Sequence, residues 1–125
     1  MIHIIDDDLN VREGFMMLLK SAGYESQTYD SAENFLKNYQ KREINDLIIL
    51  DIHLTGMSGI ELLEKMDAEK IHLPVVVITA YDDQVTRIAV RNYGALAYFR
   101  KPVDSEALID VIKYNLNSNI NQNIN

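Results

Sequence analysis

Short apolar runs alternate along the chain with longer stretches in which apolar residues recur at helical spacing. Five of these runs are predicted strands, and they cover residues 2–5, 24–29, 47–50, 75–79 and 95–99. Strands that alternate with helices are typical of a parallel sheet with helices packed on its faces. The runs at 47–50 and 75–79 are apolar throughout, which favours strands buried on both faces, whereas the more polar run at 24–29 predicts an edge strand. The pattern therefore predicts an α/β domain built from five strand–helix pairs.

Capping residues indicate where the predicted helices begin. Asp8 can cap the first helix and Ser31 the second. Residues 58–61 read Ser-Gly-Ile-Glu, which is the spacing of a capping box, so the third helix should begin there. The fourth helix is predicted at about residues 82–92, and Asp104 can cap the fifth.

The last eleven residues contain six asparagines, one at every odd position from 115 to 125. Such a polar tract buries too little apolar surface to offset the entropy of ordering the chain. We therefore expect the folded domain to cover residues 1–116, and residues 117–125 to be a frayed end or the start of a linker.

The composition of the chain limits which partners it can bind and where in the cell it can be located. The chain has 19 acidic and 12 basic residues among 125, a formal charge of −7 that disfavours direct contact with nucleic acid. Its longest apolar runs fall far short of the roughly 20 residues that a membrane-spanning helix needs, and Met1 begins a strand-like run without a basic leader. We therefore expect no membrane span, and a cytoplasmic protein.

The absence of cysteine excludes disulfide bonds, thiolate zinc sites and cysteine nucleophiles. Any metal must then be bound by oxygen or by one of the three histidines, His3, His53 and His72. His3 is expected to face outward from a strand, and His72 lies in the loop before Pro74. Oxygen ligands are therefore favoured.

Polar side chains occur where four of the predicted strands end. Asp6 and Asp7 follow the first strand, Asp51 follows the third, Thr79 ends the fourth, and Lys101 follows the fifth. The carboxyl ends of parallel strands lie at one edge of a sheet, which is where ligands bind in open α/β folds. We therefore expect three acids, one hydroxyl and one amine to converge on one site.

This set of side chains predicts an aspartyl-phosphate site. Clustered carboxylates repel one another unless a cation lies among them, and a small site of hard oxygen ligands suits Mg²⁺. A carboxylate beside a divalent cation and an ammonium group can attack phosphorus, because both positive charges stabilise the phosphoryl oxygens. Asp51 stands alone at the end of a central strand and is the expected nucleophile, whereas the adjacent Asp6 and Asp7 are suited to hold the metal. Lys101 and the Thr79 hydroxyl would contact the phosphoryl group.

The motifs that carry these residues resemble the receiver domain of bacterial two-component response regulators. The matching segments are residues 4–8, 50–52, 57–59, 77–80 and 98–102. The resemblance extends from residue 1 to about residue 116, nearly the whole chain. It implies a flavodoxin-like, doubly wound (βα)5 three-layer sandwich whose five-stranded parallel sheet has the strand order 2-1-3-4-5.

The resemblance also implies the chemistry of the site. Asp51 would be the phosphoacceptor, receiving a phosphoryl group from the phosphohistidine of a sensor histidine kinase or a phosphotransfer protein, and Lys101 would pair with the phosphate. The implied Mg²⁺ ligands are Asp6, Asp7, Asp51 and the backbone carbonyl of His53. Such a domain is a signalling phosphoacceptor that catalyses only its own phosphorylation and dephosphorylation, so we expect no enzyme with a separate substrate.

The implied switch consists of Thr79 and Tyr98. The hydroxyl would move toward the phosphate and the ring would turn inward behind it, changing the surface of the fourth helix, fifth strand and fifth helix. The expected output is transcription, through an effector domain absent from this chain that would make any contact with DNA, and a homodimer can form on phosphorylation. Arg87 and Arg91, one helical turn apart, are either a solvated face or part of such an output or dimer surface.

The sequence departs from the family pattern in the loop after the phosphoacceptor. Thr55 occupies a position where the family commonly has proline, and the loss of that ring is expected to leave the loop less constrained while adding a hydroxyl. His53 and Tyr81 flank the place of the incoming phosphate, where the family uses varied side chains to set the rate of hydrolysis. Bulky residues there are expected to slow it.

Three alternative functions share part of this pattern. A haloacid-dehalogenase-type phosphohydrolase also forms an aspartyl phosphate, and Asp51 and Thr55 match the first and last positions of its nucleophile motif. However, its second aspartate, the general acid, is His53 here, and 125 residues leave little room for a substrate cap. A flavodoxin-like electron carrier would need a hydroxyl- and glycine-rich loop after the first strand, which is missing. The intact set of site residues disfavours a degenerate receiver that only binds partners.

Overall fold

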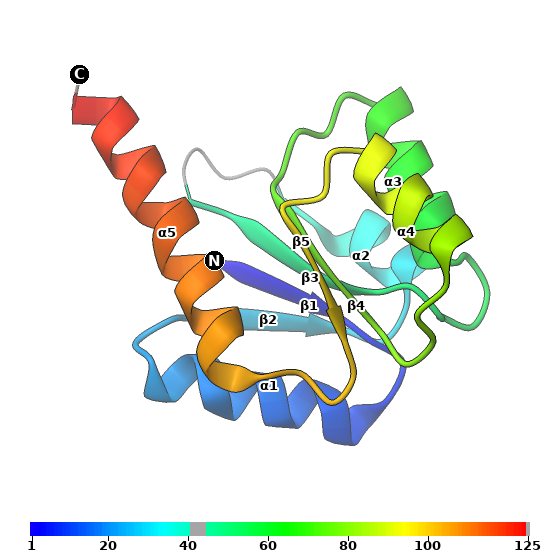
Figure 1. Ribbon diagram of the computed structural model, residues 1–125, viewed down its shortest axis with the longest axis horizontal. Helices are drawn as coiled ribbons and strands as arrows, with labels where there is room; N and C mark the ends of the chain where they lie inside the picture. Colours follow the sequence, from blue (N-terminus) through cyan, green and yellow to red (C-terminus); the bar gives the residue numbers. More distant parts are fainter. Residues whose placement is uncertain (41–44, 125) are drawn as a thin grey trace.

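A computed structural model describes residues 1–40 and 45–124 of the chain (Figure 1). Within these residues, strands and helices alternate. The strands are β1 (Ile2–Ile5), β2 (Ser26–Tyr29), β3 (Leu47–Asp51), β4 (Val75–Thr79) and β5 (Ala97–Arg100). The helices are α1 (Leu9–Ser21), α2 (Ala32–Asn38), α3 (Gly59–Ala68), α4 (Gln84–Asn92) and α5 (Ser105–Ile124). This succession confirms the five predicted strand–helix pairs.

The strands form one parallel sheet in the order β2-β1-β3-β4-β5. Helices α1 and α5 cover one face of the sheet, and α2, α3 and α4 cover the other (Figure 1). The predicted doubly wound three-layer fold and its strand order are thus confirmed. Because the order reverses between β1 and β3, the chain leaves these two strands toward opposite faces, which opens a crevice at their carboxyl ends.

Each face of the sheet has its own apolar core. On the face covered by α2, α3 and α4, Phe35 and Leu62 are fully buried, and on the face covered by α1 and α5 the same holds for Leu19 and Leu108. Every residue of β3 and β4 is buried, as the apolar runs predicted. Strands packed on both sides in this way give the side chains at their ends a rigid support.

The predicted helix caps are present. Asp8, Ser31 and Asp104 each accept hydrogen bonds from backbone N–H groups in the first turn of their helices. Ser58 and Glu61 form both halves of the predicted capping box at the start of α3. These caps fix where α1 and α3 begin, and these helices are the next elements after the two strands whose ends carry the acidic residues.

Strands β2 and β5 start later than the apolar runs predicted. The first residues of each run are instead hydrogen-bonded to the end of the preceding helix. The N–H of Tyr24 donates to the carbonyl of Leu19 at the end of α1, and the N–H of Ala95 donates to Val90 at the end of α4. These bonds close the last helical turns, so β2 and β5 each begin two residues later than predicted.

The Asn-rich segment is helical beyond residue 116. Helix α5 continues to Ile124. Extending a helix that has already formed needs far less ordering than starting a new one, so a polar tract can be carried by the turns before it. The domain boundary at 116, and a tail or the start of a linker after it, stay predictions. No helix in the described part of the chain is long and apolar enough to cross a membrane.

His3 is buried, which corrects the expectation that it faces outward. The residue is 2% exposed. Its Nδ1 lies 3.0 Å from the Tyr29 hydroxyl oxygen, and its Nε2 lies 3.1 Å from Asp46 Oδ2. Strand β1 lies between β2 and β3 with helices on both faces, so neither set of its alternating side chains reaches solvent. His72, by contrast, is exposed in the loop before β4.

Candidate functional site

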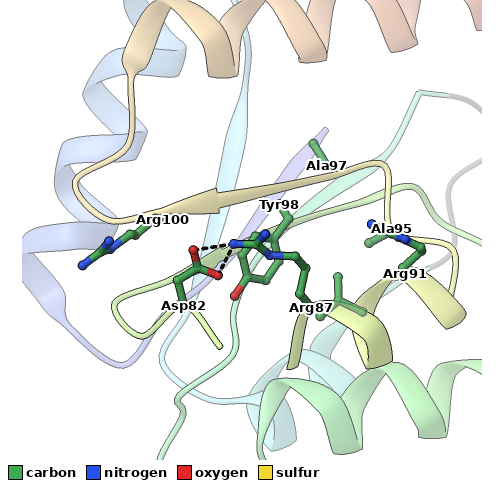
Figure 2. Close-up of a pocket in the computed structure, with 8 residues that line it drawn as sticks. Asp82, Arg87, Arg91, Ala95, Ala97, Tyr98 and Arg100 are labelled. Atoms are coloured by element: carbon green, nitrogen blue, oxygen red, sulfur yellow. Dashed lines mark hydrogen bonds and ion pairs between the residues drawn. The ribbon is translucent and has the colours of Figure 1, made fainter. Parts of the chain in front are cut away.

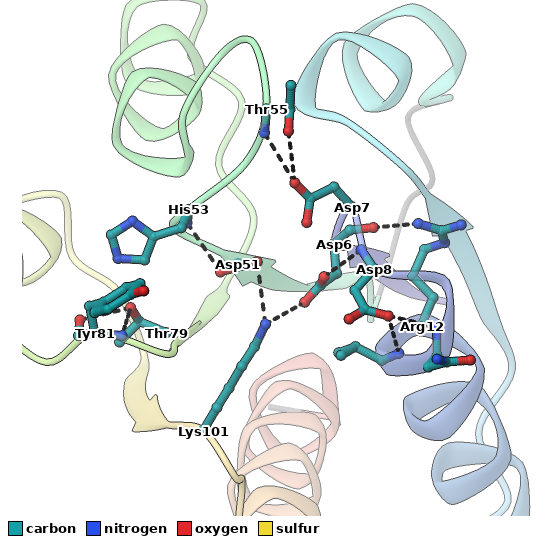
Figure 3. A network of polar contacts seen from close by, with 12 residues as sticks. Asp6, Asp7, Asp8, Arg12, Asp51, His53, Thr55, Thr79, Tyr81 and Lys101 are labelled. Atoms are coloured by element: carbon teal, nitrogen blue, oxygen red, sulfur yellow. Dashed lines mark hydrogen bonds and ion pairs between the residues drawn. The ribbon is translucent and has the colours of Figure 1, made fainter.

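Side chains from several strand ends meet at the carboxyl edge of the sheet (Figure 3). Asp6 follows β1 and is fully buried, and Asp51 ends β3 and is 3% exposed. The Lys101 N–H donates to the carbonyl of Thr79 at the end of β4 (2.7 Å), which brings the residue after β5 to the same edge. Lys101 Nζ lies 3.0 Å from Asp6 Oδ2 and 3.3 Å from Asp51 Oδ2. The structure therefore brings these predicted residues together, although Lys101 and Asp6 are 95 positions apart.

The position of Asp51 depends on close packing between α3 and the end of β3. The N–H of Gly59 donates to the carbonyl of Ile52 (2.9 Å). A Cβ atom at Gly59 would lie 2.7 Å from the backbone oxygen of Asp51, so a larger residue would push the strand end and the helix apart. The N–H of His53 donates to Asp51 Oδ1 (3.1 Å), and Asp51 Oδ2 faces Lys101.

The acidic side chains form a cluster that can hold a metal ion. Asp6, Asp7 and Asp51 each offer a carboxylate oxygen, and these oxygens lie within 4.8 Å of one another. Asp6 Oδ1 accepts the N–H of Asp8 (2.9 Å), which leaves Asp6 Oδ2 facing Lys101. Three carboxylates and one ammonium group leave an excess of negative charge. Hard oxygen ligands at this spacing fit a divalent cation such as Mg²⁺, which takes few protein ligands and keeps several waters.

Burial and the neighbouring charges together raise the pKa values of Asp51 and Lys101. Burial raises the pKa of Asp51 above its ordinary value, and repulsion by Asp6 raises it further, against the opposing effects of the His53 N–H and Lys101. Burial by itself would lower the pKa of Lys101, but its hydrogen bonds and attraction to the two carboxylates outweigh this, so its pKa is raised. The ammonium group of Lys101 therefore stays charged at neutral pH. A second cation nearby would stabilise the charged form of the Asp51 carboxylate.

The Thr79 side chain is buried at the end of β4 and is turned toward the following loop (Figure 3). Its hydroxyl donates to the carbonyl of Tyr81 (2.8 Å) and accepts the N–H of Tyr81 (3.1 Å). The rings of His53 and Tyr81 meet edge to face with centroids 5.1 Å apart. Both residues are exposed. Their effect on hydrolysis stays a prediction.

Tyr98 lies on β5 under the side chain of Arg87 from α4 (Figure 2). The guanidinium carbon is 5.6 Å from the ring centroid, a cation–π contact, and the same guanidinium pairs with both oxygens of Asp82. Burial raises the pKa of Tyr98, and the negative charge of Asp82 raises it further. With Arg91 and Arg100, these side chains line a surface pocket of about 440 Å³ between α4 and β5.

The loop between β3 and α3 makes two contacts that sequence reasoning missed. Thr55 donates through its N–H (3.2 Å) and its hydroxyl (3.1 Å) to Asp7 Oδ2, and the N–H of Met57 donates to Glu33 Oε1 on α2 (3.0 Å). Without proline the loop was expected to be less constrained, yet hydrogen bonds hold it at two points. No sequence signal pairs these residues, since they are 48 and 24 positions apart.

Comparison with known protein families matches residues 2–113 to the response regulator receiver domain. The chain belongs to this family. Residues 2–113 include every motif on which the resemblance rests, so the expected receiver domain is confirmed. Five parallel strands in the order 2-1-3-4-5 agree with that assignment.

Individual receiver proteins are similar along most of this chain. Transcriptional regulatory protein FixJ of Azorhizobium caulinodans is 32% identical over 97% of this chain, which spans 57% of that protein. Sporulation initiation phosphotransferase F of Bacillus subtilis is 31% identical over 90% of each chain. The crystal structure of a CheY-like receiver domain protein from Methanospirillum hungatei superposes with a TM-score of 0.86 at 30% identity, over 97% of this chain and 96% of the other.

These similarities do not support the phosphohydrolase alternative. The family match is to receiver domains, and His53 stands where that alternative needs a second aspartate. Since the chain spans little more than half of FixJ, the activity of a whole regulator is not carried over with the receiver domain.

Proposed function

We propose that this receiver domain accepts a phosphoryl group on Asp51 from the phosphohistidine of a sensor histidine kinase or a phosphotransfer protein. One observation carries the proposal: Lys101 Nζ lies 3.3 Å from Asp51 Oδ2 and 3.0 Å from Asp6 Oδ2, beside the carboxylate of Asp7. A nucleophilic carboxylate, a fixed ammonium group and a divalent-cation site are the parts that phosphoryl transfer to an aspartate needs.

In the transfer step, an oxygen of Asp51 attacks phosphorus while the bond from phosphorus to the histidine nitrogen breaks. The histidine leaves as an imidazole, and the phosphoryl group remains on Asp51 as an acyl phosphate. Lys101 offsets the charge on the transferred oxygens, and the His53 N–H keeps the carboxylate oriented. The Mg²⁺ ligands would be Asp6, Asp7, Asp51 and the His53 carbonyl, and a bound Mg²⁺ offsets the charge of the carboxylates and the phosphoryl oxygens.

Dephosphorylation is the attack of water on the same phosphorus, with Asp51 leaving as a carboxylate. The domain therefore acts on itself and returns to its starting state. We describe it as a signalling phosphoacceptor, and not as an enzyme that turns over a separate substrate.

Phosphorylation is proposed to act on the rest of the molecule through Thr79 and Tyr98. The Thr79 hydroxyl can exchange its bond to the Tyr81 carbonyl for one to a phosphoryl oxygen, since it can donate to either. That exchange would pull the loop before α4 toward Asp51. Tyr98 packs against α4 through Arg87, so a movement of this loop changes the pocket between α4 and β5.

The proposed donor protein docks in a groove next to the acidic cluster. The groove measures about 580 Å³ and lies between α1 and the loop after β5, where its apolar lining includes Val11, Phe15, Leu18 and Val103. Lys101 belongs to the same lining, so a helix seated here would bring its phosphohistidine close to Asp51. An amphipathic helix in an apolar groove is a common mode of protein recognition.

The proposed output is control of transcription through an effector domain that is not part of this chain, by analogy with the regulatory protein FixJ. Any contact with DNA would be made by that domain, since this one carries a formal charge of −7. We further propose a homodimer that forms on phosphorylation through the face of α4 and β5, and a cytoplasmic location.

Incubation with acetyl phosphate and Mg²⁺ tests the proposal, with intact-protein mass spectrometry as the measurement. Wild type should gain one phosphoryl group per chain, and the gain should be absent with EDTA or in Asp51→Asn. Asp67→Asn is the matched control, because it removes one exposed acid in the last turn of α3, at the end of the helix opposite to the one that contacts β3 beside Asp51. It should be modified as wild type is.

Two results would contradict the proposal. Modification that persists in Asp51→Asn would place the acceptor elsewhere. Release of phosphate from p-nitrophenyl phosphate over many turnovers per chain would favour a phosphohydrolase.

A further inference from the structure

Thr55 gives both of its hydrogen-bond donors to one oxygen of Asp7. The backbone N–H lies 3.2 Å and the hydroxyl oxygen 3.1 Å from Asp7 Oδ2. Figure 3 shows the Asp7 carboxylate turned toward Thr55, across the space between the loop after β1 and the loop after β3. Thr55 is exposed, so these bonds are not a by-product of core packing.

Asp7 differs from the other two acids of the cluster in how it is held. Asp6 and Asp51 are buried, and each is oriented by a backbone N–H and by Lys101. Asp7 is exposed, and in the part of the chain that the structure describes, both hydrogen bonds to its carboxylate come from Thr55. Since a carboxylate has two oxygens with several lone pairs, fixing Oδ2 leaves Oδ1 free to bind a cation.

The same loop is fixed a second time, by Glu33. The Met57 N–H donates to Glu33 Oε1 (3.0 Å), and a Cβ atom on Gly56 would lie 2.6 Å from Glu33 Oε2. Gly56 has φ of +81°, a conformation that glycine adopts without strain. The loop is thus held at Thr55 and again at Met57, and the His53 carbonyl lies two residues before the first of these points.

We propose that Thr55 is a positioning residue for the divalent-cation site: it holds the Asp7 carboxylate and the loop after β3 in their binding arrangement before the cation arrives. The inference rests on the proposed function, because it concerns the same Mg²⁺ site. Groups that hydrogen-bond to metal ligands fix the orientation of those ligands, and removing one typically weakens metal binding by about 10- to 100-fold. A proline at position 55 would have neither the N–H nor the hydroxyl.

Substitutions of Thr55 can test the effect of its hydrogen-bond donors apart from the effect of its side-chain shape. Thr55→Val keeps the branched shape and the N–H but removes the hydroxyl, and Thr55→Ser keeps both donors. We expect Thr55→Val to raise the dissociation constant for Mg²⁺ by about tenfold, Thr55→Ser to stay close to wild type, and Thr55→Pro to bind more weakly than Thr55→Val. Isothermal titration with Mg²⁺, and electron paramagnetic resonance with Mn²⁺, measure this on the whole chain without a phosphodonor.

The chain offers a matched control in Thr86, which donates its N–H (2.8 Å) and its hydroxyl (2.9 Å) to Asp83 outside the cluster. Thr86→Val removes an equivalent threonine–aspartate bond and should bind Mg²⁺ as wild type does. Thermal unfolding in EDTA checks that each variant is folded.

Three results would overturn the proposal while leaving the proposed function intact, given that wild type binds Mg²⁺ and is phosphorylated. These are unchanged binding by Thr55→Val, tighter binding by Thr55→Val, or a loss in Thr55→Ser as large as that in Thr55→Val. Tighter binding would mean that the hydroxyl competes with the cation for Asp7. Failure of wild type to bind either metal would overturn both proposals together.

Discussion

The Asp51 carboxylate is held in a place that disfavours its own charge. Burial raises its pKa first, and the neighbouring Asp6 raises it further. In the unfolded chain an aspartate loses its proton at a pKa of about 3.9. Between that value and the raised pKa of the folded state, the folded protein binds more protons than the unfolded chain. The free energy of unfolding therefore falls as pH rises through this window, and the loss persists at higher pH.

Asp51→Asn should consequently be more stable than wild type when no divalent cation is present. We expect a larger free energy of unfolding for the variant in EDTA at neutral pH, and a difference that shrinks as pH falls below the ordinary pKa of aspartate. Lys101 keeps its contact with Asp6 in the variant, so its charge remains paired. Urea denaturation as a function of pH measures the effect.

Mg²⁺ should reverse this order of stability. A ligand that binds only the folded state adds about 2.7 kcal/mol at a hundred times its dissociation constant, and wild type has the full set of carboxylates to bind it. Asp67→Asn, which removes a charge on α3, should follow wild type in both conditions. A wild type that is more stable than Asp51→Asn in EDTA would show that the carboxylate is not strained.

At the scale of elements, the contact between α3 and β3 sets the position of the site. Gly59→Ala should lower the free energy of unfolding by about 1–3 kcal/mol, because the new Cβ would lie 2.7 Å from backbone atoms of Asp51 and Ile52. Gly14 on α1 is the control, since a Cβ atom there meets nothing within 4 Å. Gly14→Ala should raise stability by about 0.5–1 kcal/mol through helix propensity alone. Chemical denaturation of both variants tests the contrast, and equal effects would contradict it.

Local signals predict the elements well wherever one interaction dominates. Continuous apolar runs predicted β3 and β4, and Ser58 with Glu61 predicted the start of α3, because each pattern has one favourable structure. The prediction was wrong where a neighbouring element changes the balance. His3, expected to face outward, is buried because helices cover both faces of β1.

At the scale of the whole molecule, the site too could be predicted wherever a single factor determines the position of a residue. Parallel strands deliver their carboxyl ends to one edge, so topology alone brings Asp6, Asp51 and Lys101 together from positions far apart in the sequence. The contacts of Thr55 and Glu33 could not be predicted, because they depend on the path of a loop and not on the end of a strand. Sequence patterns thus predict which groups meet, and the structure adds how each is oriented.

The acidic character of the whole chain bears on how two copies could associate. A formal charge of −7 makes copies repel, so a homodimer needs a face whose own positive and negative side chains can pair when it meets the same face of a second copy. Arg87, Arg91 and Arg100 line the pocket between α4 and β5, and Val85 and Ile88 expose 79% and 48% of their surface on the same helix. With Asp82 in the same lining, this face combines exposed apolar area with arginines and an acid that can pair with their counterparts on a second copy.

Arg91→Glu should weaken a dimer formed on this face by about tenfold or more, since it replaces a positive charge that can pair with an acidic side chain of the other copy by a negative charge that repels it. Sedimentation equilibrium with and without beryllofluoride and Mg²⁺, which mimic phosphorylation, measures the association. Wild type should shift from monomer toward dimer when the mimic is added. Lys37→Glu changes the net charge equally on the exposed surface of α2, and it should dimerise as wild type does. Equal weakening by the two variants would mean that overall charge, and not the face of α4 and β5, governs association.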